Sequence, residues 1–156
     1  MRCFCGALAM LAAPLFPLLL LAAPPTPNFT GTWELNSAKS PGEEGRTITV
    51  TIQDAAGKIS FKRVVRQKDG KEETSQFSCE VGGNQCDFAE GGHTAKVSLW
   101  YNGPALMILK TDGPKEDSVN QWKLELSADG KTMNVEFSHI EPNDKSENLV
   151  FDKKSS

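Results

Sequence analysis

From residue 29 onward the chain alternates between apolar and polar positions in short runs, and no apolar pattern with the helical period of about 3.6 residues is sustained. Runs rich in Val, Ile, Thr, Phe and Trp are typical of strands, and turn residues separate them. The strands predicted in this way cover residues 29–35, 46–53, 58–66, 72–79, 94–101, 105–110, 119–127, 132–140 and 148–152. Glycines that accept the positive φ of tight turns fall in the breaks at positions 57, 70, 103 and 130. The pattern therefore predicts an antiparallel meander of successive hairpins.

Period-two alternation gives the clearest of these strands one apolar face. The sets that share a face are Phe29, Trp33 and Leu35, then Ile48, Val50 and Ile52, and then Met133, Val135 and Phe137. An open sheet of about nine or ten such strands would leave two edges exposed, and closure into an up-and-down barrel removes both. We therefore predict an all-β fold, an antiparallel up-and-down meander closed into a small barrel. A β-sandwich is the alternative, because strand pattern alone does not separate the two.

The first 23 residues have the three parts of a secretory signal, namely the basic Arg2, a short apolar run and an end of small residues at Ala23. Pro14 and Pro17 interrupt the run, which is shorter than the roughly 20 residues that a spanning helix prefers. We predict a signal peptide at 1–23, a short linker at 24–28, a single β-barrel domain at 29–153 and a tail at 154–156. The protein is then secreted or periplasmic, with no membrane span after processing, and an uncleaved anchor is the alternative.

The chain has 17 basic and 20 acidic residues, and loss of Arg2 with the leader changes the formal net charge from −3 to −4. This acidic balance argues against nucleic acid and anionic membranes as partners, because both attract basic surfaces.

Cys79 and Cys86 are the only cysteines after the leader, and in an exported protein two such residues are expected to pair. Gly82 and Gly83 between them predict a turn that places the two sulfurs across a hairpin from each other. Closing so short a loop stabilises the fold by roughly 2 to 3 kcal/mol. The spacing is not C-x-x-C and has no accompanying Cys or His pair, so neither a redox pair nor a metal site is expected.

Residues 28–36 read Asn-Phe-Thr-Gly-Thr-Trp-Glu-Leu-Asn, in which Gly31 and Trp33 form a G-x-W motif at the start of the first strand. Together with the meander that follows, this start resembles the lipocalins and fatty-acid-binding proteins of the calycin superfamily. It is similar in particular to short secreted bacterial lipocalin-like domains, as is the late segment 128–137. The resemblance spans residues 28–153 and implies a small lipocalin-like barrel. Lipocalins place a basic residue late in the barrel over the Trp, and the late candidates here are Lys153 and Lys154.

Five residues are candidate ligand contacts, namely Trp33, Arg63, Tyr101, Trp122 and His139. Trp33 forms either the floor of a pocket or a plug at one barrel end, and the plug is preferred because an indole buries a large area. Tyr101 and Trp122 are interpreted as pocket walls or as half-exposed packing.

Arg63 shares its strand face with Ile59, Phe61 and Val65, which would place a guanidinium among inward residues. A buried guanidinium needs a carboxylate or a ligand anion, so an anchor for a carboxylate ligand is one interpretation. A β-bulge that turns Arg63 outward is the other, and it is preferred.

His139 is in phase with Phe137, and Glu141 follows it, a pair that could bind a metal or act as acid and base. The chain has neither a nucleophile–base motif nor an H-x-x-x-H spacing, so we expect no enzyme, no metal and no cofactor.

The leading interpretation is an exported binding domain that holds a small hydrophobic or carboxylate-bearing molecule in the barrel. A filled barrel that serves as a structural or protein-interaction domain of the cell envelope is the alternative, and an enzyme using His139, Glu141 and Arg63 is third. An interior pocket of about 300 Å³ or more would favour the first.

Overall fold

Ten strands build the part of the chain that the computed structural model describes, which comprises residues 26–112, 118–141 and 144–155. The strands are β1 (Gly31–Leu35), β2 (Thr47–Ala55), β3 (Lys58–Arg66), β4 (Glu72–Glu80), β5 (Cys86–Glu90), β6 (His93–Asn102), β7 (Ala105–Asp112), β8 (Ser118–Leu126), β9 (Thr132–Glu141) and β10 (Lys145–Lys153). The leader predicted at 1–23 lies outside the described residues. No helix within them is long and apolar enough to cross a membrane.

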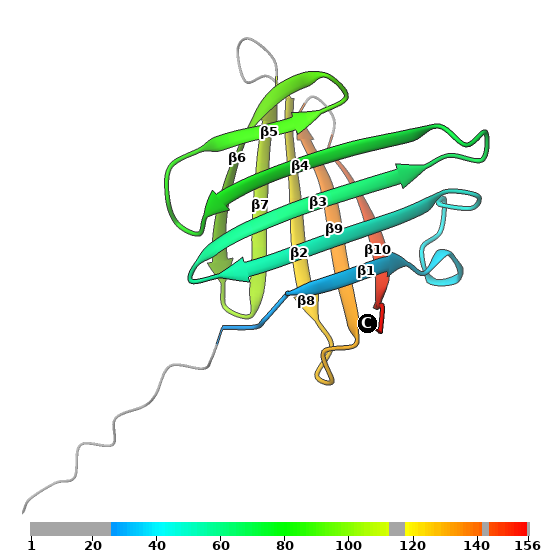
Figure 1. Ribbon diagram of the computed structural model, residues 1–156, viewed down its shortest axis with the longest axis horizontal. Coiled ribbons are helices and arrows are strands. Elements are labelled where there is room, and N and C mark those ends of the chain that lie inside the picture. Colours follow the sequence, from blue (N-terminus) through cyan, green and yellow to red (C-terminus); the bar gives the residue numbers. More distant parts are fainter. Residues whose placement is uncertain (1–25, 113–117, 142–143, 156) are drawn as a thin grey trace, which may run out of the picture.

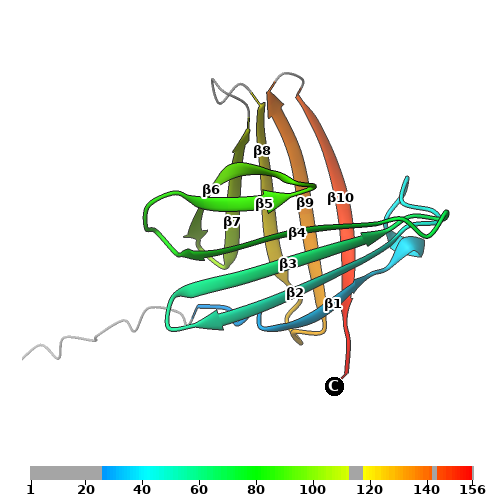
Figure 2. The same cartoon turned by 45° about the horizontal axis from the view of Figure 1, so that its top comes forward.

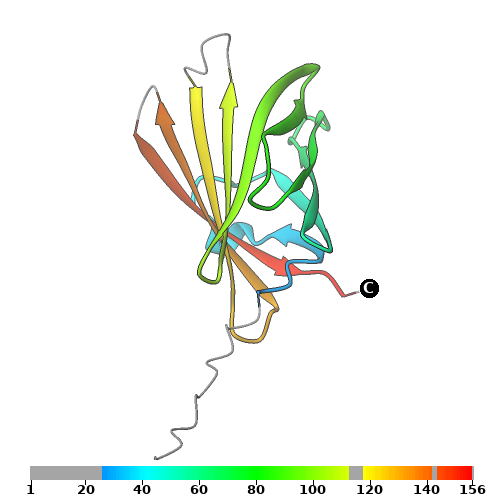
Figure 3. The ribbon, with the colours of Figure 1, turned by 90° about the vertical axis from the view of Figure 1, so that its left-hand side faces the viewer.

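Each strand pairs antiparallel with its neighbours in sequence, and β1 pairs with β10 to close the barrel. The predicted all-β barrel is confirmed, and the β-sandwich alternative is wrong. Strands β1 to β4 cross the front of the barrel, while β7 to β10 run from top to bottom behind them (Figure 1). Figures 2 and 3 show these two walls from other directions. The β1–β2 connection (residues 36–46), which contains the short 3-10 helix η1 (Ser37–Lys39), lies beside the β3–β4 turn at one end of the barrel.

The inward faces are those predicted from the alternation, since Ile48, Ile52 and Met133 are at most 1% exposed. Trp33 is fully buried, and its indole Nε1 donates a hydrogen bond to the carbonyl oxygen of Phe29 at 3.0 Å. The Phe29 ring lies 6.5 Å from that of Tyr101, which precedes the β6–β7 turn, so these rings pack at the barrel end opposite the β1–β2 connection. An indole that is both buried and hydrogen-bonded to the backbone is the plug preferred from the sequence.

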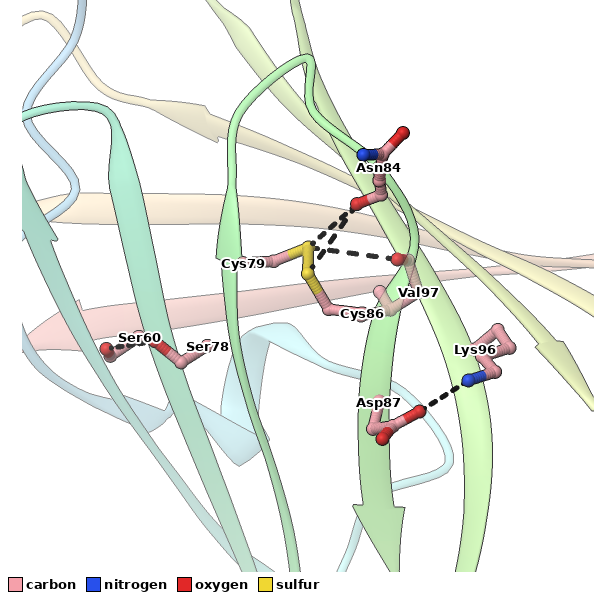
Figure 4. Close-up of a disulfide and its surroundings, with 8 residues drawn as sticks. All are labelled: Ser60, Ser78, Cys79, Asn84, Cys86, Asp87, Lys96 and Val97. Carbon is pink, nitrogen blue, oxygen red and sulfur yellow. Dashed lines mark hydrogen bonds and ion pairs between the residues drawn. A yellow bond between two sulfur atoms is a disulfide. The ribbon is translucent and has the colours of Figure 1, made fainter.

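Strand β5 was not among the predicted strands, although the hairpin that leads into it was. Its five residues include two acids and form only two residue pairs with β4, Ser75–Glu90 and Gln76–Ala89. Beyond these pairs the disulfide between Cys79 and Cys86 joins the two strands, with Cα atoms 5.7 Å apart, as predicted (Figure 4). The disulfide therefore holds β4 to β5 where the backbone ladder has stopped.

Candidate functional site

A cavity of about 280 Å³ lies inside the barrel between the wall of β2 and β3 and the wall of β8, β9 and β10. Its aliphatic lining consists of Ile48, Val50, Leu124, Met133, Val135 and Leu149. The volume is slightly below the lower limit of about 300 Å³ that is usual for small-molecule pockets and that was set from the sequence. The barrel is therefore not filled completely by its own side chains.

Polar side chains gather at one end of this cavity, next to the β1–β2 connection. They are Glu43, Arg46, Arg63, His139 and Glu147. Antiparallel pairing explains the gathering, because the end of β9 and the start of β10 meet at the same rim of the barrel, where β3 also ends. The cavity thus has an apolar body and a charged end, which is the arrangement that an amphipathic ligand requires.

Arg63 faces the cavity from a regular strand. Its Cα pairs with Val50 on one side and Ser75 on the other, and the register of β3 with both neighbours is uninterrupted from Lys58 to Arg66. The β-bulge preferred from the sequence is therefore wrong, and alternation holds Arg63 inward. Burial lowers the pKa of its guanidinium, while the charges of Glu90 and Glu43 act in the opposite direction. An arginine nevertheless stays protonated in proteins, so Arg63 is a cation inside the barrel.

Arg63 makes no hydrogen bond or ion pair with any residue in the described ranges. This sets it apart from Lys110, another cation on the inner wall, which is 7% exposed and bonds to Glu90. A charge removed from water is costly unless it is paired. The half-buried guanidinium of Arg63 therefore faces the cavity without a direct partner among the described residues, and so does the buried Oε2 of Glu43.

Glu43 reaches the cavity from the β1–β2 connection. The connection is fixed to β10, because the backbone N–H of Val150 donates to Ser40 Oγ at 2.9 Å and the N–H of Asn36 donates to the Val150 carbonyl at 2.8 Å. The residue is 5% exposed; Arg46 donates to its Oε1, and its Oε2 is buried without a partner among the described residues. Burial raises the pKa of the Glu43 carboxyl, and the nearby charge of Arg46 offsets only part of this rise.

Aromatic rings form an arc around the inside of the barrel. Consecutive ring centres are 5.0 Å apart for Phe61–Phe77, 5.7 Å for Phe77–Phe88, 6.3 Å for Phe88–Trp122, 5.0 Å for Trp122–Phe137 and 4.5 Å for Phe137–His139. We call these six residues the aromatic arc. Phe61 at one end of the arc lines the cavity, and so do Trp122, Phe137 and His139 toward the other end.

The structure brings three of the five predicted ligand contacts together, since Arg63, Trp122 and His139 all line the cavity. Trp33 and Tyr101 do not line it and lie toward the opposite end, so they are not part of the candidate site. The Tyr101 hydroxyl donates to Asp54 Oδ2 at 3.4 Å, and burial together with the Asp54 charge raises the pKa of Tyr101 to about 12.

Two carboxylates of the site, Glu43 and Glu147, were missed in the sequence. Glu147 had a signal, because it is in phase with Leu149 and Phe151, but the strand was predicted to begin only at residue 148. Glu43 had none, since it lies in a polar connection where no periodicity assigns a direction. Within the described ranges, no group of three or more His, Cys, Asp or Glu residues is placed to hold a metal ion.

No protein-family model matches this chain, and no curated protein matches it in sequence. Solved structures do share its fold. The REP1-NXSQ fatty acid transporter is 17% identical with a TM-score of 0.62, over 82% of this chain and 97% of that one. Secretory abundant heat soluble protein 4 from Ramazzottius varieornatus is 13% identical with a TM-score of 0.61, over 83% of this chain and 98% of that one. The fatty-acid-binding protein from Manduca sexta is 13% identical with a TM-score of 0.57, over 80% of this chain and 98% of that one.

Proposed function

We propose that this protein is a non-enzymatic binding barrel that holds one small apolar molecule bearing a carboxylate. The observation that carries the proposal is the guanidinium of Arg63, which faces an apolar cavity and has no partner in the described residues. A ligand carboxylate at this point would accept charge-assisted hydrogen bonds from the guanidinium and neutralise its charge. The apolar part of the ligand would then lie along the aliphatic and aromatic walls.

The cavity favours this function over a filled structural barrel, because a filled barrel would leave no room for a ligand. Two of the solved structures with the same fold are, by name, a fatty acid transporter and a fatty-acid-binding protein. At this level of identity they support the fold, and a small apolar ligand is one that such a barrel can hold. The His139 side chain packs edge-on against Phe137, which supports a wall residue more than a catalytic base.

The same proposal places the protein outside the cytoplasm. The signal-like composition of residues 1–23 and the Cys79–Cys86 disulfide both support export, since disulfides persist in oxidising compartments. The ligand would then be one encountered in the periplasm or outside the cell.

Calorimetric titration with decanoate and its neutral analogue decanamide tests the function. We expect decanoate to bind about 10- to 100-fold more tightly, as a hydrogen-bonded charge pair implies, and Arg63→Met to remove this difference. Lys62→Met is the matched control, because Lys62 is the adjacent cation on β3 and points to the exposed face. Equal binding of the acid and the amide, or an Arg63→Met variant that keeps the difference between them, would refute the proposed function.

A further inference from the structure

The arrangement of the rings in the aromatic arc bears on the shape of the apolar part of the ligand. Its rings stack in series, and the interplanar angles are 6° for Phe61–Phe77 and 25° for Trp122–Phe137. No ring contact joins Phe61 to Phe137 among the described residues, and both line the cavity from facing walls. The series of rings is thus interrupted at the cavity.

We propose that the ligand is a flat aromatic carboxylic acid, whose ring lies between Phe61 and Phe137 and whose carboxylate lies at Arg63. This inference rests on the proposed function and specifies its ligand class. A ligand ring in this gap would continue the arc, because aromatic rings favour offset or edge contacts at centroid separations of about 4.5 to 7 Å.

The spacing of Phe61 and Arg63 along β3 is compatible with contacts to both parts of such a ligand. Phe61 and Arg63 are two residues apart on β3 and both line the cavity, so their levels differ by about 7 Å at the usual rise per residue. A carboxylate joined directly to a fused two-ring system spans a comparable length. The charged group can therefore reach Arg63 while the outer ring lies at the level of Phe61.

The size and stiffness of the site favour the same class. A cavity of about 280 Å³ is near the small end of the range of small-molecule pockets, which favours a compact ligand. A two-ring acid is compact enough for such a pocket, whereas a long acyl chain is better suited to a larger one. A rigid ring also loses less conformational freedom on binding than a chain does.

Competitive titration of 2-naphthoate and decanoate tests the inference, since the two acids have the same charge and nearly the same size. We expect the wild type to bind 2-naphthoate about tenfold more tightly, because each added ring contact contributes a factor of about two to ten. Phe137→Leu should reduce this preference to near unity and leave the affinity for decanoate within about threefold. Leu149→Met changes a cavity residue without a ring and should keep the preference.

The possible failures are distinguishable. Equal or tighter binding of decanoate by the wild type, or a Phe137→Leu variant that weakens both acids alike, would overturn the aromatic class and leave the proposed function standing. Absence of binding for both acids would overturn the proposed function itself. The near-ultraviolet circular dichroism and the thermal midpoint of Phe137→Leu verify that the variant is folded before the titration.

Discussion

The ammonium nitrogen of Lys153 lies 5.1 Å from the centre of the Trp33 ring, and the two residues pair directly across the seam between β1 and β10. Gly31 makes room for this contact, because a Cβ at that position would lie 2.7 Å from Lys153 Cε. Gly31 also has a φ of 151°, which residues with a side chain rarely adopt. The G-x-W motif and a late lysine thus form one closure of the barrel.

Lys153→Met should lower the free energy of unfolding by about 0.5 to 1 kcal/mol, because the variant keeps an apolar chain over the indole and loses the cation. Lys154→Met is the matched control. Lys154 makes an exposed ion pair with Glu34, and the loss of such a pair costs about 0.5 kcal/mol or less. Urea unfolding of both variants measures the difference, and equal costs would contradict the role of the Lys153–Trp33 contact.

Trp33→Ala should lower the free energy of unfolding by about 3 to 5 kcal/mol, since it removes a fully buried ring and leaves a cavity at the barrel end. Trp100→Ala is the comparison, because Trp100 follows the inward Leu99 on β6 and is only partly buried. Trp100→Ala should lower the free energy of unfolding by about 1 kcal/mol, which is the spread of strand propensities among residue types in a host protein. Denaturant midpoints that rank the two variants in the opposite order would show that Trp33 is not the plug.

Replacing both Cys79 and Cys86 by Ser should lower the free energy of unfolding by about 2.5 kcal/mol, the entropy estimate for so short a closed loop. The stabilisation has a local reason, because β4 and β5 share only two ladder pairs. A reductant should lower the denaturation midpoint of the wild type to that of the double variant and leave the variant unchanged. Free thiols in the unreduced native protein would refute the disulfide.

Glu43 should make the stability depend on pH in a definite direction. Burial raises its pKa in the folded protein above the ordinary value of 4.5, so the folded state binds more protons between the two values. The stability of the wild type relative to Glu43→Gln should therefore rise as the pH falls through the folded pKa, and be largest below about 4.5. Glu44→Gln, at the exposed neighbouring position, controls for net charge. Denaturant titrations from pH 7 downward measure this, and a relative stability that stays constant or falls would contradict it.

The sequence predicted the walls of the barrel well, because alternation is a local property. Met133 and Val135 could be assigned inward from a single strand, and the glycines at the turns marked where each strand ends. Strand β5 was missed because its short run, from Cys86 to Glu90, mixes acids with one large apolar residue.

The site was only partly predictable, because it depends on side chains that the closed barrel brings together from distant strands. Alternation placed Arg63 inward, but the cost of an unpaired cation suggested a bulge, and the structure shows an inward cation without one. Glu43 lies at the cavity because Asn36 and Ser40 fix its connection to β10, the latter through a contact between residues 110 positions apart. The cavity volume is the small difference between the volume enclosed by the strands and the volume of the inward side chains. No local sequence pattern predicts that difference.

The proposed function is tested most directly by locating the residues that a ligand contacts. Nuclear magnetic resonance of the ¹⁵N-labelled protein, titrated with decanoate, can follow the side-chain N–H signals of Arg63, Trp122 and Trp33 separately. We predict that the signals of Arg63 and Trp122 shift and saturate at the same decanoate concentration, because both line the cavity, while the buried indole of Trp33 stays unchanged. Shifts confined to Trp33 or to the outer-face Trp100, with Arg63 and Trp122 unmoved, would contradict the claim that this cavity is the binding site.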